Sequence, residues 1–573
     1  MAALEWASWD DDPLTRAREE DKIVLLFLGP AWCRFTREMR ESTFRDPKIV
    51  RAVQKDFVPV LVDADRRPDL DSRYNMGGWP TVSFVSPEGE LIAGENFLTA
   101  QELLPLLGKV CSYYRKHRED IAAGIDIKWK PGRVSEREEP TLDPNLADEV
   151  IASMLEKFDH RFGGWGGTQK FAHPESLDFA LVQYSRTNDP RMAEIVQLTL
   201  TNMMQGGIHD AVEGGFFRYS TTPDWRVPHY EKVLDNNALR LSCFTEAYQV
   251  FGDPGYKRAA QGIVDWMIDV MRDPETGALY GSQGDSETYF GKDAEGRKRV
   301  DPPVLDRTIY TNWNAMAVFS LLKASVVLEK PEVRERAMEI LDFLLRRLYS
   351  EREGMYHYWD GTYHLPGFLS DQAYMIRALI AASQCDGNAD LLLPAERLAD
   401  LLLDKHRAPG GGFYDLPESG HNRGALRKRN RSILENSVLA EALTRLAYLS
   451  HQTKYRTVAE ETLLAFSGDY REYGYFVAGY ARAVDLYLND PVVVTIVGDR
   501  DSSLAKALRG AAQRSYVASR IVQTLDPAHD PVLLERSGLE PTERAKAWLS
   551  RGEEMLGSFE DPDELAKRMS EAM

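Results

Sequence analysis

Apolar residues recur at helical spacing along most of the chain, and these stretches come in pairs. Short polar segments separate the two members of each pair. The pairs are 174–185 with 191–204, 230–251 with 255–271, 311–328 with 331–348, 369–384 with 389–405, and 433–450 with 455–466. A last helix is predicted at 475–488, and a helix that begins at residue 143 is available to pair with it. The central part of the chain is therefore predicted to consist of helical hairpins.

A turn rich in glycine and aromatic residues precedes the first helix of each pair. Copies of this turn lie at 162–165, 213–217, 277–280, 354–356, 410–414 and, more loosely, 473–476. An internal repeat of this kind indicates a repeated architecture before any local detail is considered. Six turns with two helices each predict an all-α (α/α)6 toroid, a ring of six helical hairpins, over residues 143–490.

The first part of the chain has a different pattern. A continuous apolar run at 22–28 predicts a strand that is covered on both faces. Cys33 and a helix at 37–44 follow, and further strands are predicted at 58–63 and 81–85. This order, with Trp79-Pro80 before the last strand, is that of an α/β thioredoxin-like fold, which we place at residues 1–125. In such folds this proline is cis and faces the cysteine, whose thiolate is stabilised by the helix N-terminus.

A dithiol redox centre needs a second thiol, but position 36 is threonine. Two interpretations of Cys33 stay open: a small buried hydrophobe in a structural domain, or a monothiol that forms mixed disulfides. Residues 126–142 are polar and charged and predict a linker. Residues 491–573 predict a small α/β appendage of βαβ type. Its strands are expected at 492–497, 517–522 and 546–549, and its helices at 502–515 and 561–573.

Composition narrows the function classes. The chain has 70 basic and 89 acidic residues, a net charge of −19, which disfavours nucleic acid and anionic membranes as partners. It contains no apolar run long enough to span a membrane and no signal-peptide pattern at its start, so a cytoplasmic protein is expected. Four scattered cysteines predict neither a disulfide framework nor a zinc site, and we expect no metal or cofactor. The basic run 427–431 is interpreted as a solvated approach to the next helix.

The first helices of the pairs are predicted to start at one end of the ring, where aromatic, amide and charged residues gather. Aromatic faces with amides and carboxylates suit a polyhydroxylated, carbohydrate-like ligand. The residues predicted to bind it are Trp165, His173, His209, Arg218, Tyr219, Trp225, Lys232, Glu287, Trp313, Asn314, Asp415 and Asn436. Helix capping is the competing explanation for the Ser, Asp and Asn residues among the helix starts.

The segment 227–232 has the densest cluster of candidate catalytic groups, with His229 and Glu231 as general acid or base. Asp285 and Asp371 supply further carboxylates. A glycosidase needs two carboxyl groups at a defined separation across the sugar. An epimerase that works next to a carbonyl needs two bases on opposite faces, and two histidines would serve. The sequence does not decide between these two reactions.

The ordered motifs resemble the family of spermatogenesis-associated protein 20 and its bacterial relatives over almost the whole chain. The motifs that carry the resemblance are 41–44, 62–70, 77–80, 170–174, 206–210, 214–220, 227–232, 367–371 and 412–415. The resemblance implies a thioredoxin-like domain followed by a toroid similar to glycosidases and N-acylglucosamine 2-epimerases.

Departures from the family pattern bear on redox chemistry. The family usually has Cys-His-Trp-Cys at 33–36, and two further cysteines where this chain has Ser550 and Met555. Phe217 and Asn312 stand where a histidine and an aspartate are expected. Three hypotheses follow: an enzyme that hydrolyses or epimerises a sugar or polyol, a non-catalytic glycan- or protein-binding module, and a monothiol redox protein that acts through Cys33 with Pro80 beside it.

Overall fold

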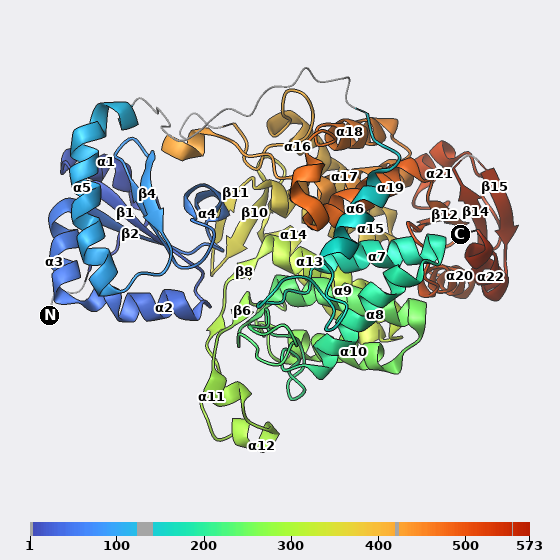
Figure 1. Ribbon diagram of the computed structural model, residues 1–573. Helices are drawn as coiled ribbons and strands as arrows, with labels where there is room; N and C mark the ends of the chain where they lie inside the picture. Colours follow the sequence, from blue (N-terminus) through green and yellow to red (C-terminus); the bar gives the residue numbers. More distant parts are fainter. Residues whose placement is uncertain (1–3, 123–140, 419–422, 553, 573) are drawn as a thin grey trace. The chain divides into compact units, whose positions relative to one another are not determined.

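The computed structural model describes residues 4–122, 141–418, 423–552 and 554–572, and the chain divides into two compact units (Figure 1). Unit one comprises residues 1–138 and 418–430, and unit two comprises 139–417 and 431–573. The predicted linker 126–142 lies almost entirely outside the described residues. No described helix combines the length and apolar character that crossing a membrane would require.

Unit one is built around a four-stranded sheet in the order β2-β1-β3-β4. Strands β1 (Ile23–Leu28) and β2 (Phe57–Val62) run parallel, whereas β3 (Thr81–Val85) and β4 (Leu91–Glu95) continue the sheet in antiparallel pairs. All six residues of β1 are buried, as its unbroken apolar run predicts. The helices are α1 (Pro13–Glu19), α2 (Arg34–Glu41), α3 (Pro47–Asp56), α4 (Pro68–Tyr74) and α5 (Ala100–Ala122), with 3₁₀ turns at Trp9–Asp11 and Thr43–Arg45. This arrangement confirms the thioredoxin-like fold.

A segment from between the later toroid helices belongs to unit one. The 3₁₀ turn η4 (Gly424–Arg427) lies against the β3–β4 turn, where the Ala425 amide donates to the Gly89 carbonyl at 3.1 Å. Leu426 is buried in the core of unit one, and Arg427 pairs with Glu90 at 3.0 Å. The Arg427 side chain is 60% exposed, which agrees with the interpretation of 427–431 as a solvated segment, and its pair with Glu90 is a surface contact.

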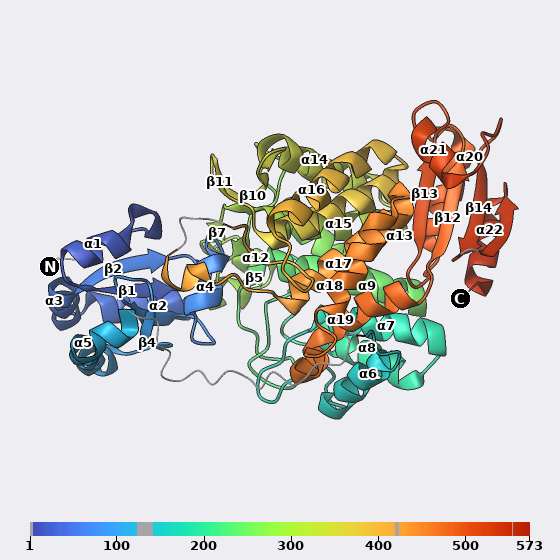
Figure 2. The same cartoon turned by 90° about the horizontal axis from the view of Figure 1, so that it is seen from above.

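Unit two contains the predicted ring. Its inner helices are α7 (Pro174–Thr187), α9 (Leu234–Phe251), α13 (Thr311–Val327), α15 (Leu369–Asp386), α17 (Ile433–Ser450) and α19 (Ala478–Leu488). Its outer helices are α6 (Leu146–Lys157), α8 (Pro190–Gln205), α10 (Pro254–Asp269), α14 (Pro331–Arg347), α16 (Leu392–Lys405) and α18 (Thr453–Leu464). Each inner helix packs against the next, and α19 packs against α7, so the ring closes as predicted (Figure 2). The 3₁₀ turn η3 (Ala389–Leu391) connects α15 to α16, and η5 (Tyr470–Val477) connects α18 to α19.

Short strands line the loops that lead into the inner helices. One small sheet has β5 (Lys232–Val233), β6 (Ser282–Gln283) and β7 (Leu305–Asp306). A second has β8 (Ile309–Tyr310), β9 (Tyr349–Ser350), β10 (Gly354–Trp359) and β11 (Tyr363–Pro366). Two single-turn helices, α11 (Glu287–Phe290) and α12 (Ala294–Arg297), lie between β6 and β7. Most of these strands have only two residues, too few to show the alternation by which a strand is predicted.

A repeated hydrogen-bond motif explains why the glycine turns recur. In four inner helices, the fourth residue is a buried amide side chain that accepts from and donates to the backbone of one residue in the preceding turn. The pairs are Asn237 with Phe216, Asn314 with Leu279, Gln372 with Met355, and Asn436 with Phe413. We call these four side chains the amide clamps.

The amide clamps also account for the glycines. Gly412 has a φ of 72°, and a Cβ at this position would lie 3.2 Å from the Asn436 Oδ1 atom. A side chain there would strain the backbone and crowd the clamp. Each repeat therefore needs a glycine in the turn and an amide on the helix, and the turn carries the loop that leads to the helix start.

The C-terminal region forms a second four-stranded sheet that packs beside the ring. It contains β12 (Val492–Val497), α20 (Ser503–Arg514), β13 (Ile521–Leu525), α21 (Pro531–Ser537), β14 (Lys546–Arg551), β15 (Glu554–Phe559) and α22 (Pro562–Glu571). The strand order β13-β12-β14-β15 and the strand directions are those of the sheet in unit one. The βαβ prediction missed β15, because its apolar residues do not alternate regularly with polar ones and only Phe559 is buried. The chain thus repeats the thioredoxin-like topology at its C-terminal end.

Candidate functional site

The starts of the inner helices lie together and carry acidic side chains. Glu175, Asp235, Asp371 and Glu435 are in the first turns of α7, α9, α15 and α17. Charges of Glu175, Glu435 and Asp235 all act on the hydroxyl of Tyr374 in α15, which shows that these helix starts are close in space. We call these four carboxylates the acidic end of the ring. Negative side chains there are stabilised by the helix dipoles, whose N-terminal ends are positive.

Three of these carboxyl groups, Glu175, Asp235 and Asp371, have a raised pKa. Burial raises the pKa of Asp235, against the lowering effects of Asn236, Arg218 and Arg240. Burial also raises the pKa of Glu175, and the charge of Asp235 adds to this effect. The Glu175 side chain nevertheless keeps a large solvent-exposed surface, the combination expected on a concave surface. The acidic end therefore offers carboxyl groups that are available to a ligand and protonate more readily than usual.

A buried histidine and an aspartate form the first of two pairs near the acidic end. His357, on β10, places its Nδ1 atom 2.9 Å from the Asp371 Oδ2 atom. Both side chains are almost fully buried, and burial raises the pKa of Asp371 while His357 lowers it. The Asn312 amide, at the start of α13, donates to the Asp371 Oδ1 atom at 3.2 Å. Asp371 therefore orients the His357 ring. We assign it a positioning role in place of the catalytic role predicted from the sequence.

The predicted cluster at 227–232 contains the second pair. His229 is hydrogen-bonded through Nδ1 to the Oε2 atom of Glu231, which is fully buried. Arg218 lies 3.8 Å from the Glu231 Oε1 atom, and the Tyr219 ring stacks on His229 with 5.0 Å between centroids. His229, Glu231, Arg218 and Tyr219 are thus brought together, and the burial of Glu231 gives it a positioning role rather than the acid–base role predicted.

Lys232 belongs to an internal ion cluster and is fully buried. Its ammonium group is 2.7 Å from Asp210, which Arg297 also holds at 2.8 Å, and both cations lie near Glu213. Burial alone would raise the pKa of Asp210, but Arg297 and Lys232 bring it down to about 2. This cluster fixes the loop that contains α12, and Lys232 is withdrawn from the ligand-binding set.

Several other predicted binding residues are buried and hold the fold. Trp165 and Trp225 are fully buried, and their indole N–H groups donate to the Met154 and Phe162 carbonyls. Asn314 and Asn436 are amide clamps with no exposed surface. These four side chains offer no atoms to a ligand, so we also withdraw them. They were predicted to bind a ligand because they are aromatic or amide side chains near the helix starts. The turns before the helices use the same residue types to hold the fold.

The remaining predicted residues lie in different surroundings. His173 precedes α7, and burial among aromatic rings lowers its pKa to about 4. His209 lines a groove between α8 and α10 together with Arg258 and Asp265, away from the inner helices. Trp313 is half-buried beside Tyr310 at the start of α13. Asp285 and Asp415 are on loops, and Glu287 is the first residue of α11. Asp285 and Glu287 act electrostatically on Tyr230, and the Asp415 carbonyl accepts from the Leu369 amide.

In unit one, Cys33 is the N-cap of α2 and is buried, and its sulfur lies 4.0 Å from the Trp79 carbonyl. The Trp79–Pro80 peptide is cis, as predicted. Thr36 is buried in the first turn of α2. The monothiol hypothesis stays a prediction, which trapped mixed disulfides in the wild type and their loss in Cys33→Ser would support.

Among the described residues, no group of histidine, cysteine and acidic side chains has the arrangement of a metal site. His357 is the main residue that the sequence interpretation missed. It directly follows the turn at 354–356, where the predicted repeat ends at Tyr356. The signal was a histidine at the end of an aromatic turn, but its carboxylate partner is fourteen positions away and becomes visible only when β10 packs on α15.

Comparison with known proteins first defines the two domain classes. A model described as "Thioredox_DsbH: Protein of unknown function, DUF255" matches residues 1–128. The N-acylglucosamine 2-epimerase (GlcNAc 2-epimerase) model matches residues 214–415, which include Asp235 and Asp371 of the acidic end. The chain therefore combines a DsbH-like thioredoxin domain with a ring of the N-acylglucosamine 2-epimerase type.

The particular relatives are spermatogenesis-associated protein 20 of rat and of human. Each is 23% identical to this chain over 98% of its length and 89% of the relative. The resemblance predicted from the motifs is confirmed. Solved structures similar to the ring include cellobiose 2-epimerase from Spirochaeta thermophila, with 16% identity and a TM-score of 0.48. A D-mannose isomerase has 10% identity and the same TM-score, and each match covers 60% of this chain and 96% of the other.

Proposed function

We propose that the acidic end binds a sugar with a reactive carbonyl group and transfers a proton at the carbon atom next to that carbonyl. The observation that carries this proposal is the presence of two histidine–carboxylate pairs, His357–Asp371 and His229–Glu231, near the starts of α15 and α9. In each pair the carboxylate contacts the Nδ1 atom of the histidine, which orients the imidazole ring. The N-acylglucosamine 2-epimerase match over 214–415 contains both pairs.

The reaction follows from this geometry. One histidine takes the proton from the carbon next to the carbonyl, and the electron pair of the broken C–H bond moves to form an enediolate. Arg218, which lies over the Phe171 and Tyr219 rings, supplies positive charge for the developing oxyanion. Return of a proton to the opposite face inverts the carbon, and return to the neighbouring carbon interconverts an aldose and a ketose. Inversion therefore needs a base on each face of the sugar carbon, whereas isomerisation needs only one base.

Hydrogen exchange tests the proposal because inversion and isomerisation share the same first step. The protein is incubated with N-acylglucosamine, cellobiose or D-mannose in D2O, and NMR follows the loss of the proton at C2. We expect exchange with at least one sugar in the wild type. Loss of a general base typically costs about 10²- to 10⁴-fold in rate, which we expect for His357→Asn. His229→Asn should have a similar effect on inversion.

His451→Asn is the matched control, because His451 is half-buried, hydrogen-bonded to Gln523 and distant from the acidic end. It should leave the exchange rate unchanged. Retention of wild-type exchange in both His357→Asn and His229→Asn would refute the assignment of the bases. Absence of exchange in a wild type that binds one of these sugars would refute the reaction.

Hydrolysis of a glycoside is the second candidate, and one observation favours it. Glu175 and Asp235 interact electrostatically and both have a raised pKa, as the general acid of a glycosidase requires. In that case reducing ends would appear from an oligosaccharide, and Asp235→Asn would abolish their release while His357→Asn would not.

A further inference from the structure

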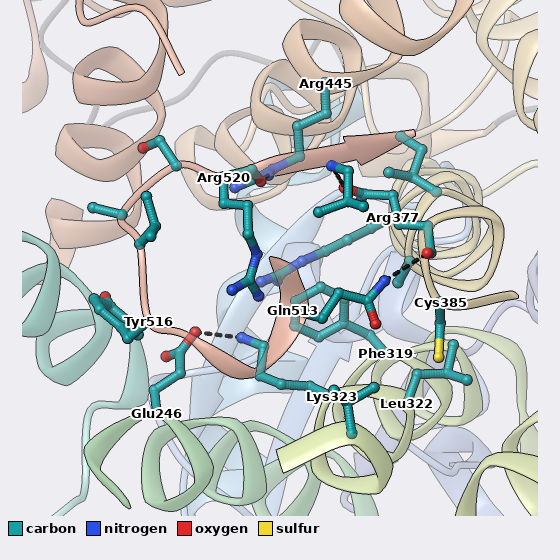
Figure 3. A pocket seen from close by; sticks show the side chains of 18 of the residues that line it. Glu246, Phe319, Leu322, Lys323, Arg377, Cys385, Arg445, Gln513, Tyr516 and Arg520 are labelled. Atoms are coloured by element: carbon teal, nitrogen blue, oxygen red, sulfur yellow. Dashed lines mark hydrogen bonds and ion pairs between the residues drawn. The ribbon is translucent and has the colours of Figure 1, made fainter. Parts of the chain in front are cut away.

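A cavity of about 140 Å3 lies inside unit two, away from the acidic end (Figure 3). Glu246, Lys323 and Arg445 line it, and each is twelve residues after the first residue of its inner helix. At 1.5 Å per residue this places them about 18 Å from the helix starts. Gln513, Tyr516 and Arg520 of the C-terminal region line the opposite side. The cavity therefore lies between the ring and its C-terminal sheet.

The lining has more positive than negative charge. Five basic side chains, Lys323, Arg377, Arg445, Arg482 and Arg520, face the cavity together with two carboxylates, Glu246 and Glu441, an excess of three positive charges. We call these five side chains the basic end. The whole chain has a net charge of −19, so this local excess is opposite to the overall charge.

Three of the five cations have carboxylate partners. Lys323 pairs with Glu246, and the dashed line in Figure 3 marks this contact. Arg445 is 3.0 Å from Glu441, and Arg482 is 3.5 Å from Asp178. Arg445 also donates to the Arg520 carbonyl at 2.9 Å, which ties the ring to the C-terminal region. These contacts hold the side chains of Lys323, Arg445 and Arg482 in place in the cavity wall.

The other two cations have no carboxylate within ion-pair distance among the described residues. The Arg377 guanidinium lies 4.0 Å from the centroid of the Phe319 ring, and Arg520 donates to the Ser515 carbonyl. Burial lowers the pKa of Arg520 to about 10, and the neighbouring Arg445 contributes to this shift. In Figure 3 the side chains of Arg377 and Arg520 both point into the cavity. Both side chains are half-buried, and Glu441 and Glu246 act on Arg377 and Arg520 only without direct contact. Half-buried cations with no carboxylate in direct contact are compensated only in part, which favours an external anion.

The helix ends act differently on these two groups. The negative partial charge at a helix C-terminus acts within its last turn. Arg377 is nine residues before the end of α15 at Asp386, so no helix end compensates its charge. Arg520 lies between α20 and β13 and donates to the carbonyl of Ser515, the C-cap of α20, so the end of that helix stabilises its charge in part.

We propose that the basic end binds a phosphate-type tetrahedral oxyanion between Arg377 and Arg520. Guanidinium forks match the oxygen geometry of such anions. The volume of about 140 Å3 exceeds the roughly 10–15 Å3 that one water needs, so it admits a compact anion with several waters. The anion would bridge the ring and the C-terminal region. The charge of Arg377 also acts on Glu175 at the acidic end, so the two proposals are separated by their ligands and their variants.

Thermal unfolding of the full-length protein tests the site. Inorganic phosphate and sulfate are titrated at constant ionic strength, with chloride as the balancing anion. A ligand that binds only the folded state raises the Tm in a saturable manner. We expect saturable increases with phosphate or sulfate in the wild type, and at least a tenfold weaker response in Arg377→Gln/Arg520→Gln.

Arg346→Gln is the matched control, because Arg346 is on the outer helix α14 with a side chain 71% exposed. It should keep the wild-type response. Equal stabilisation by chloride, or an unchanged phosphate response in the double variant, would overturn the proposal. Should the double variant unfold, each single variant is tested, and phosphate binding is measured by equilibrium dialysis. Undiminished binding to both folded single variants would also refute the site.

Discussion

The two ends of the inner helices differ in charge and in the way that charge is balanced. At the acidic end, carboxyl groups lie in the first turns of neighbouring helices, and burial raises the pKa of Glu175, Asp235 and Asp371. At the basic end, Glu441 is held between arginines, and although burial alone would raise its pKa, Arg445 and Arg482 bring it well below its ordinary range. The charged form of a carboxyl group is thus destabilised at the acidic end, whereas at the basic end it is stabilised by ion pairs.

The difference shows where the ring can do chemistry. A group whose charge is destabilised by its surroundings is suited to proton transfer, whereas a group in a tight ion pair holds structure. The helix dipoles favour the same distribution, with acidic side chains at the N-terminal ends and most basic side chains toward the C-terminal ends. The proposed reaction is therefore assigned to the acidic end and the proposed anion to the basic end.

The largest expected effect concerns Asp371 at the acidic end. Asp371→Asn keeps the acceptor for the Asn312 amide but removes the charge that fixes the His357 tautomer. We expect the rate of C2–H exchange to fall by about 10²- to 10⁴-fold with little change in sugar affinity. Exchange by NMR and affinity by calorimetry separate the two quantities. A parallel loss of affinity and rate would indicate a binding role instead.

At the basic end, Glu441→Gln should destabilise the fold. Removal of one partner from a buried ion pair typically costs about 3–5 kcal/mol, because the remaining cations lose their compensation. The folded pKa of Glu441 is lowered, so its stabilisation is present above the unfolded pKa and is lost as the pH falls through the folded value. Urea unfolding at pH 7 measures this loss, and an unchanged midpoint would contradict the ion-pair account.

The amide clamps make a third prediction about the acidic end. Asn436→Ala removes hydrogen bonds to the Phe413 and Ser432 backbones and leaves buried groups unsatisfied. We expect a loss of about 3 kcal/mol, since each unsatisfied buried group costs roughly 1–3 kcal/mol. Asn202→Ala, which removes one local bond to the Leu198 carbonyl, should cost less than about 1.5 kcal/mol. Equal losses in urea unfolding would show that the clamp has no special role.

The smallest effect has the opposite sign. Asp235→Asn should stabilise the protein by at most about 1 kcal/mol, a usual size for one substitution. Because the folded pKa of Asp235 is raised above 3.8, the wild type loses stability as the pH rises through the folded value. The gain should therefore be present at pH 8 and vanish below pH 3.8, where the wild-type carboxyl is protonated in both states. Destabilisation at pH 8 would contradict the account.

The fold could be predicted from the sequence because its repeats are local. The glycine turns and helix pairs at 143–490 gave the closed ring, and the apolar run at 22–28 with Cys33 and Pro80 gave the first thioredoxin-like sheet. The second sheet was only partly predicted. Ser502 caps α20 where Cys33 precedes α2, and Ala545 precedes β14 where Pro80 precedes β3, so the markers of the fold are missing there.

The candidate site was less predictable because it depends on contacts between distant segments. His229, Glu231 and Arg218 are close in sequence and were found together. His357 and Asp371 meet only through the packing of β10 on α15, and Arg377 and Arg520 only through the packing of the C-terminal region on the ring. Residue type alone also could not separate Asn314, a clamp, from a side chain that faces a ligand.

The most direct test of the central claim, that the two ends bind different ligands, is one thermal-shift experiment with two ligands and two variants. A sugar that exchanges at C2 and inorganic phosphate are each titrated into the wild type, Glu175→Gln and Arg377→Gln/Arg520→Gln. We predict that Glu175→Gln loses the sugar response and keeps the phosphate response, and that the arginine variant does the reverse. Loss of both responses in either folded variant, or of neither in both, would contradict this claim.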